Sequence, residues 1–182
     1  NYYAQQPAAN DWLYSMYLSG ANALVSKSKL DQLDGFDELF APFYVEDYEL
    51  SLRAWRIGWK CYYEHQAVCR HQVSVTIKSK SRKSDINTIY YRNKMFLHAM
   101  HLEGKAKWLW ALQLLPETLL RVCTGRLYYV KSLQQFLSQL PAMRRSKQAF
   151  MALSARQGTL ISVRNVVDLI IQQIGNRPIH RF

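Results

Sequence analysis

The sequence predicts an α/β fold, in the form of an α+β fragment, followed by a basic helical region. Short alternating or aromatic segments at residues 22–26, 59–64 and 67–71 predict strands. Apolar residues at helical spacing predict helices from residue 46 to Gly58 and throughout the chain beyond Asp85. Charge changes as well: residues 1–75 carry 6 Lys/Arg against 9 Asp/Glu, and residues 76–182 carry 18 against 4. We therefore divide the chain into residues 1–84 and a basic amphipathic helical C-terminal region, residues 85–182.

An adjacent carboxylate pair, Glu46 and Asp47, lies in the stretch that is richest in reactive side chains, residues 35–58. Pro42 disfavours helix before it, so a helix is expected to begin at or just before Glu46. A carboxylate in the first turn of a helix is held ionised by the macrodipole and by free backbone amides. Asp47 is therefore a candidate proton acceptor, although such acidic pairs also serve simply as helix caps.

Both faces of this helix are apolar, which predicts that it is wedged between two layers. One face carries Tyr48, Leu52 and Trp55, and the other carries Leu50, Ala54 and Ile57.

Small and aromatic residues upstream are predicted to contact the substrates. Gly20 and Ala21 have little bulk and allow a substrate to approach the backbone closely. Trp12 and Tyr14 offer flat rings on which a sugar would stack, and packing in the core explains the same rings equally well.

The order and spacing of these residues resemble the second half of the catalytic domain of family 2 glycosyltransferases. The matching residues are Gly20-Ala21, Gly35-Phe36-Asp37-Glu38, Phe40, Glu46-Asp47, Leu50, Arg53, Gly58 and His71. The resemblance covers about residues 10–95, and Arg92-Asn93 is similar to a pair on the helix that often follows this domain. It implies the acceptor half of a nucleotide-diphospho-sugar transferase (GT-A type) fold.

The resemblance also implies a reaction: inverting transfer of a sugar from a nucleotide-diphosphate sugar to the hydroxyl of a glycan or lipid-linked acceptor, of the envelope polysaccharide type. Asp47 then corresponds to the catalytic base, with Glu46 beside it, and His71 to a histidine that faces the metal or the diphosphate. Arg53 and Gly20-Ala21 are expected to contact substrate, and Mn²⁺ or Mg²⁺ is the expected cofactor.

Two departures accompany the resemblance. Asp34 stands where the family usually has a second Gly before Gly35, and the nucleotide-binding half with its Asp-x-Asp metal motif is absent. Most metal ligands are therefore expected from a preceding half. The chain starts at Asn1 without a signal peptide, and we expect an inactive fragment of a longer enzyme.

A polar, basic segment at residues 74–84 predicts a loop that closes over the donor diphosphate, with Lys80 and Arg82 supplying positive charge. A disordered basic linker is the alternative. The helices beyond it combine apolar stripes with Lys and Arg, so they either pack on each other or lie on a lipid surface. No apolar run reaches the roughly 18–20 residues of a bilayer span. We therefore expect a cytoplasmic protein, with peripheral contact to the inner face of the cytoplasmic membrane as an option.

The three cysteines, Cys61, Cys69 and Cys123, lack the spacing of zinc ligands and predict free thiols in a reducing compartment. The basic helices leave one alternative function, a non-catalytic module that binds nucleic acid or a membrane surface. No recognised nucleic-acid motif is present, and residues 1–75 are acidic and aromatic, so nucleic acid is not an expected partner.

Overall fold

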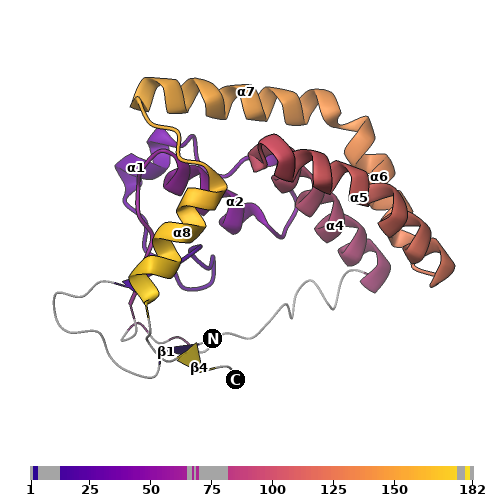
Figure 1. Cartoon of the computed structure of the whole chain (residues 1–182), viewed down its shortest axis with the longest axis horizontal. Helices are drawn as coiled ribbons and strands as arrows, with labels where there is room; N and C mark the ends of the chain where they lie inside the picture. The colour runs from indigo at the N-terminus through magenta and orange to yellow at the C-terminus, as the bar shows by residue number, and fades with distance from the viewer. Residues whose placement is uncertain are drawn as a thin grey trace.

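The computed structural model describes residues 2–3, 13–64, 67, 69, 82–175 and 179–180 (Figure 1). Helices make up most of the described residues. In chain order they are α1 (Lys27–Gln32), the 3-10 helix η1 (Glu38–Phe40), α2 (Glu46–Arg56), α4 (Lys83–His101), α5 (Gly104–Cys123), α6 (Tyr128–Ser138), α7 (Leu140–Gln157) and α8 (Val163–Ile174). The strands form two antiparallel pairs: β1 (Tyr2–Tyr3) with β4 (Ile179–His180), and β2 (Leu13–Tyr14) with β3 (Tyr62–Tyr63).

The predicted α/β fold is therefore confirmed only in part, because the described strands form two-stranded sheets and helices dominate. Residues 22–26 form no strand. Leu24 is 98% exposed, so this segment has no apolar face that a sheet would bury. In the segment 59–64 only Tyr62 and Tyr63 pair with a partner strand. Most of the third predicted strand, 67–71, lies outside the described residues.

Helix α2 begins at Glu46, as predicted from the sequence. The two residues before it, Tyr44 and Val45, adopt left-handed backbone conformations, with φ of 71° and 75°. Such conformations disfavour a preceding helical turn, so α2 starts abruptly. The helix ends before Gly58, whose φ of 89° suits the turn that reverses the chain.

Both faces of α2 are buried, which confirms the predicted wedge. Leu52 packs in a core cluster with Phe40 and Phe96. Leu50 belongs to a second cluster, and Trp55 to a third that includes Val166 of α8. Three cores therefore meet on one helix.

A buried polar network also crosses α2. Glu49 accepts from Arg53 Nε at 2.9 Å, and its other oxygen lies 3.2 Å from His101 Nε2 at the end of α4. Arg56 donates to the Ile161 carbonyl at 3.0 Å and pairs with Glu103. Because these charges are paired and hydrogen-bonded, their burial is tolerated.

The helical region, residues 85–182, packs on the N-terminal part of the described chain, residues 13–64. Figure 1 shows α4, α5 and α6 side by side, α7 running along the top from the end of α6 to above α1, and α8 returning to α2. Phe96 of α4 shares a core with Phe40 and Leu52, so the hydrophobic core runs across residue 84. Within the described ranges, no helix has both the length and the apolar character needed to cross a bilayer.

Candidate active site

The Asp47 carboxylate is held at the start of α2 by two backbone amides. Its Oδ1 accepts from the Tyr48 N–H at 2.7 Å and its Oδ2 accepts from the Gly20 N–H at 3.2 Å. Gly20 is 27 residues away in sequence, so the structure brings together two positions that sequence analysis assigned to one site. Ala21 follows Gly20 and is exposed.

A second pair of contacts fixes the loop that carries Gly20. The Leu18 N–H donates to Ser51 Oγ at 2.9 Å, and Ser51 Oγ donates to the Asp47 carbonyl at 2.7 Å. The loop and the first turn of α2 are therefore one hydrogen-bonded unit, and the distance from Gly20 to the carboxylate is set by the backbone.

The residues before α2 are held in place by Asn93, a fully buried residue of α4. Its Nδ2 lies 2.7 Å from the Phe40 carbonyl, 3.1 Å from the Phe43 carbonyl and 2.8 Å from the Tyr44 carbonyl. The two hydrogens of this buried amide are shared among three carbonyls of one turn, which fixes the shape of the turn. Asn93 thereby determines where the carboxylate pair begins.

Arg92 completes this clamp. Its Nη2 donates to the Ala41 carbonyl at 2.5 Å, and its Nε donates to Asn93 Oδ1 at 3.0 Å. Both polar ends of the Asn93 amide are thus engaged, one by the turn and one by the neighbouring guanidinium. The Arg92-Asn93 pair was noted in the sequence for its resemblance alone, and its contacts give it a positioning role.

Asp47 lines a cavity of about 520 Å³ between α2 and α4. The other lining residues are mostly aromatic, basic or apolar: Tyr17, Val45, Tyr48, Leu52, Tyr90, Lys94, Leu97, His98, His101, Leu102 and Val163. The rings of Tyr17 and Tyr48 lie 5.6 Å apart, and Lys94 Nζ lies 5.6 Å from the Tyr90 ring. Flat rings beside a carboxylate and a cation suit a sugar-bearing ligand.

Glu46 has different surroundings from Asp47. It does not line the cavity, and its Oε2 is buried without a hydrogen-bond partner among the described residues. Burial raises the pKa of the Glu46 carboxyl, and the adjacent Asp47 charge raises it further. A carboxyl with a raised pKa beside a cavity-facing carboxylate is typical of a functional site.

His98 lies on the α4 wall of the cavity, with its ring 5.6 Å from that of Trp110. Burial lowers the pKa of the His98 imidazole, and the nearby Lys94 charge lowers it further. The ring is therefore predominantly neutral at pH 7.

The remaining predicted site residues differ in how the structure places them. Arg53 is buried and donates to Glu49, to the Leu33 carbonyl and to the Gly35 carbonyl at 2.8 Å. These bonds favour a structural role for Arg53 over the substrate contact that the sequence predicted. Arg82 is exposed and directly precedes α4. Trp12, His71 and Lys80 lie outside the described residues.

Two residues that precede His71 in sequence contact the Gly20 loop. Asn22 Nδ2 donates to the Ala67 carbonyl at 2.8 Å, and Cys69 Sγ lies 4.0 Å from the Ala21 carbonyl. Ala67 and Cys69 thus contact the loop that donates to the Asp47 carboxylate.

The metal site predicted from the resemblance is not assembled by the described residues. These contain no group of three or more His, Cys, Asp or Glu side chains that would hold an ion.

Sequence analysis missed the α4 wall of the cavity. Tyr90, Lys94 and His98 recur at a spacing of four residues and therefore share one face of a helix. That spacing was a usable signal, whereas the packing of this face against α2 was not visible in the sequence.

Comparisons with known proteins place the chain in a family. The family model described as glycosyl transferase family group 2 matches residues 8–155, a range that includes every residue lining the Asp47 cavity except Val163, includes Asn93 and Arg92, and extends through most of α7. Searches of curated proteins and of solved structures found no match. Because the matched range exceeds half of the 182 residues, the chain belongs to glycosyl transferase family group 2.

Proposed function

We propose that the protein takes part in an inverting transfer of a sugar from a nucleotide-diphosphate sugar to the hydroxyl of a glycan or lipid-linked acceptor, of the envelope polysaccharide type. Family membership supports a glycosyltransferase with a nucleotide-sugar donor and an acceptor in general. The single observation that carries the assignment of the base is the orientation of Asp47, which lines the aromatic cavity while Glu46 does not.

In the proposed reaction, Asp47 accepts the proton of the acceptor hydroxyl as its oxygen attacks the anomeric carbon of the donor. A new C–O bond forms on one face of the sugar while the bond to the diphosphate breaks on the other. The nucleotide diphosphate leaves with the electron pair, so one displacement inverts the anomeric centre. The backbone amides of Gly20 and Tyr48 orient the carboxylate for this step.

The acceptor is proposed to occupy the cavity. The Tyr17 and Tyr48 rings offer a stacking surface near Asp47, and Lys94 on the α4 wall offers a cation to a polar or anionic group. The donor would approach from the side of Gly20-Ala21, where the absence of bulky side chains exposes the backbone.

Several finer parts of the proposal rest on the family resemblance alone. They are a Mn²⁺ or Mg²⁺ ion, His71 as a ligand of that ion or of the diphosphate, and the supply of charge by Lys80 and Arg82. A peripheral position on the inner face of the cytoplasmic membrane and inactivity of this chain on its own are also proposals.

The test of the base is Asp47→Asn in the complete enzyme, which keeps the size of the side chain and removes its basicity. We expect sugar transfer to fall by about a thousandfold or more, within the range that loss of a catalytic proton acceptor produces. Binding of the nucleotide-sugar donor, measured by calorimetry, should persist. Asp31→Asn, on the exposed surface of α1, is the matched control. Transfer that continues in Asp47→Asn would remove Asp47 from this role.

A further inference from the structure

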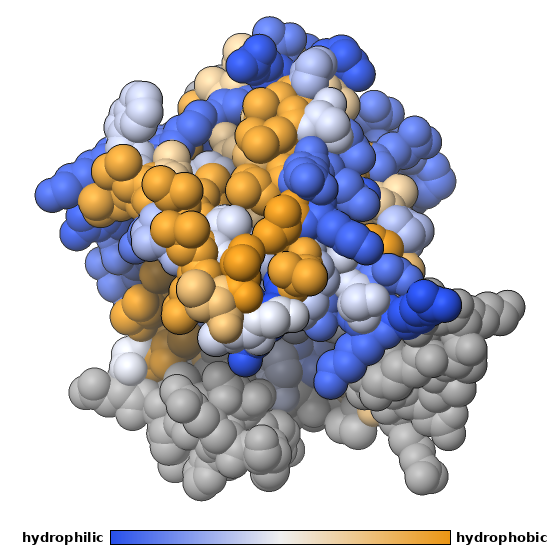
Figure 2. Space-filling view, turned by 90° about the vertical axis from the view of Figure 1, so that its right-hand side faces the viewer, coloured by the Kyte–Doolittle hydropathy of each residue, from blue (hydrophilic) through white to orange (hydrophobic). Residues whose placement is uncertain are grey.

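Helix α5 turns an apolar face away from the protein. Its outward residues recur at helical spacing, and Trp108, Leu112 and Leu115 are 73%, 70% and 69% exposed. The same face continues through Leu109, Leu119, Leu120 and Val122, all exposed. None of the residues of α5 is buried. Figure 2 shows apolar side chains gathered on the side of the molecule that carries the ends of α5 and α6.

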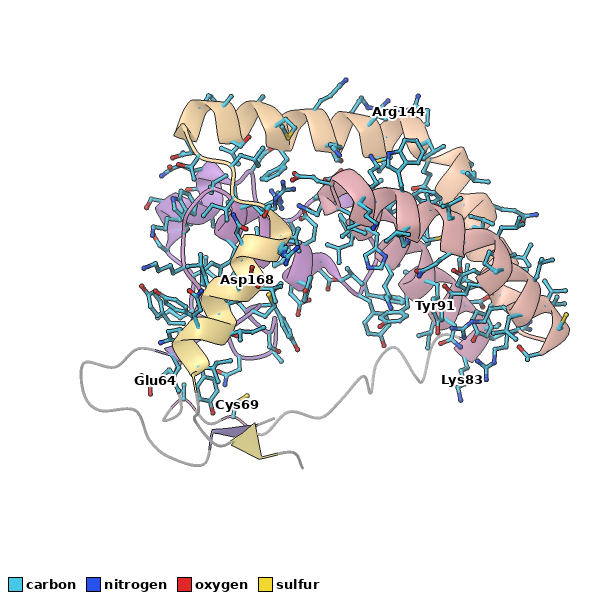
Figure 3. The ribbon with its side chains drawn as sticks, viewed as in Figure 1. Glu64, Cys69, Lys83, Tyr91, Arg144 and Asp168 are labelled. Atoms are coloured by element: carbon cyan, nitrogen blue, oxygen red, sulfur yellow. The ribbon has the colours of Figure 1, made fainter. Side chains whose placement is uncertain are left out.

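The charged and polar contacts of α5 lie on its opposite, inward face. Between Trp108 and Cys123 the charged residues are Glu117 and Arg121, which pair at 3.1 Å. The Arg121 guanidinium also lies 5.0 Å from the Tyr91 ring, and Figure 3 shows Tyr91 on α4, in the region where α4 and α5 lie together. Trp110 packs on Phe136 of α6. The pattern is the reverse of a surface helix of a water-exposed bundle, whose outward face is polar.

Positive charge flanks this apolar face at both of its ends. Lys105 is exposed at the first turn of α5, and Arg126 is exposed just beyond its last turn. Neither is in an ion pair within the part of the chain that the structure describes. The neighbouring acidic residues are already engaged, Glu103 by Arg56 and Glu117 by Arg121. The described surface at the ends of α5 therefore carries positive charges that no acidic side chain neutralises.

We propose that the outward face of α5, defined by Trp108, Leu112, Leu115 and Leu119, lies in the interfacial layer of an anionic lipid bilayer. This inference rests on the peripheral membrane contact in the proposed function and names the surface that makes it. Leucine and tryptophan side chains would enter the boundary between headgroups and acyl chains, while Lys105 and Arg126 contact anionic headgroups.

Charge favours lipid over a second copy of the chain as the occupant of this face. The chain carries a net charge of +11, and two copies joined through α5 would bring Lys105 and Arg126 of one close to those of the other. Anionic headgroups neutralise these residues instead.

The test is flotation of the purified chain with vesicles of phosphatidylcholine and phosphatidylglycerol, compared with phosphatidylcholine alone. We expect co-flotation that depends on phosphatidylglycerol and weakens at high salt. Leu112→Glu combined with Leu115→Glu should lower the vesicle-bound fraction by about tenfold or more. Leu24→Glu is the matched control, because Leu24 is 98% exposed on the loop before α1. Circular dichroism verifies that each variant is folded.

A second variant separates the electrostatic contribution. Lys105→Glu with Arg126→Glu should weaken binding to the anionic vesicles, whereas Arg164→Glu on α8 should not. No flotation with anionic vesicles, or flotation unchanged in the α5 variants, would overturn the proposal. A dimer in light scattering that disappears in the Leu112→Glu, Leu115→Glu variant, without flotation, would make this face a protein interface. The vesicles contain no sugar donor, so failure here is distinct from failure of the transfer assay.

Discussion

The three thiols of the chain lie in different surroundings, and their reactivity should differ accordingly. Burial raises the pKa of Cys61 to about 11, whereas Cys69 and Cys123 are exposed. The thiolate is the reactive species, and a raised pKa together with burial removes it. Iodoacetamide at pH 8, followed by peptide mass spectrometry, should modify Cys69 and Cys123 at least about tenfold faster than Cys61. In urea all three should react alike, and fast modification of Cys61 in the native protein would contradict its burial.

The stability of the fold should decrease below pH 6.5 because of His101. Burial lowers the pKa of this imidazole below its ordinary value of 6.5, and the Arg56 and Arg53 charges act in the same direction, against the contact with Glu49. The unfolded chain therefore binds a proton first as the pH falls. The contribution of neutral His101 is present above pH 6.5 and is lost as the pH falls toward the lowered pKa.

Urea unfolding at a series of pH values measures this effect. The slope of unfolding free energy against pH between 6.5 and 5 should be smaller in His101→Gln than in the wild type. His98→Gln should also reduce the slope, because burial lowers the pKa of His98 in the same direction. If the slope in His101→Gln equals that of the wild type, the pH dependence of stability arises from other titratable groups and the prediction is wrong.

Among single residues, placements that depend on local order were predictable from the sequence. Asp47 lies in the first turn of a helix that begins after Pro42, and its proximity to Gly20 agrees with the family resemblance. Lys94 was not predicted, because its contribution depends on which face of α4 packs toward α2. The burial of Arg53 was not predictable for the same reason. The sequence of an amphipathic helix does not show whether a given basic side chain points inward.

At the scale of elements, Asn93 ties α4 to the turn that precedes α2. Asn93→Ala would leave three backbone carbonyls of that turn without a side chain donor. A buried polar group that loses its partner costs ~1–3 kcal/mol, so we expect a loss of about 3 kcal/mol in the free energy of unfolding, since the three groups lie together. Urea denaturation measures it.

A catalytic readout distinguishes positioning from bulk stability. In the complete enzyme, Asn93→Ala should lower kcat more than it changes KM. Without the Asn93 amide the turn before α2 moves, and this displaces Asp47 rather than the aromatic rings of the cavity. Gln32→Ala is the matched control, since the Gln32 side-chain amide also donates to a carbonyl but lies on the exposed surface of α1. An equal effect of both variants on kcat would argue against a special role for Asn93.

Helix ends were predicted better than strands. Pro42 and Gly58 mark the limits of α2 by backbone chemistry that acts locally. Strands depend on partners: the segment 22–26 has a suitable composition but finds no neighbouring strand, whereas Tyr62 and Tyr63 pair with Leu13 and Tyr14 across nearly fifty residues.

For the whole molecule, α8 closes a core that the front of the chain leaves open. Val166 is fully buried in the cluster of Trp55, whereas its neighbour Val167 is 36% exposed. Val166→Asp would bury an unpaired charge, and we expect a loss of more than about 3 kcal/mol in the free energy of unfolding. Val167→Asp should change it by about 0.5 kcal/mol or less. Urea denaturation followed by Trp fluorescence compares the two, and similar losses would contradict the placement of α8.

The distribution of charge along the sequence suggested two regions, and the packing joins them. Core residues on both sides of residue 84 share one cluster, and the Arg56 guanidinium donates to a carbonyl 105 residues later. Charge composition reports what a surface contacts, whereas core membership depends on apolar contacts that span the chain. The family match likewise runs past residue 84, to residue 155.

The three clusters that converge on α2 restrict how the protein can respond to a ligand. A helix that packs against three hydrophobic clusters cannot tilt or slide unless all three clusters repack together. Asp47 is therefore expected to keep its place when a ligand binds, and the Gly20 loop, which is hydrogen-bonded to the first turn of α2, stays with it. Changes of substrate preference are therefore expected at exposed positions around the cavity, such as Tyr17, while α2 and Asp47 stay unchanged.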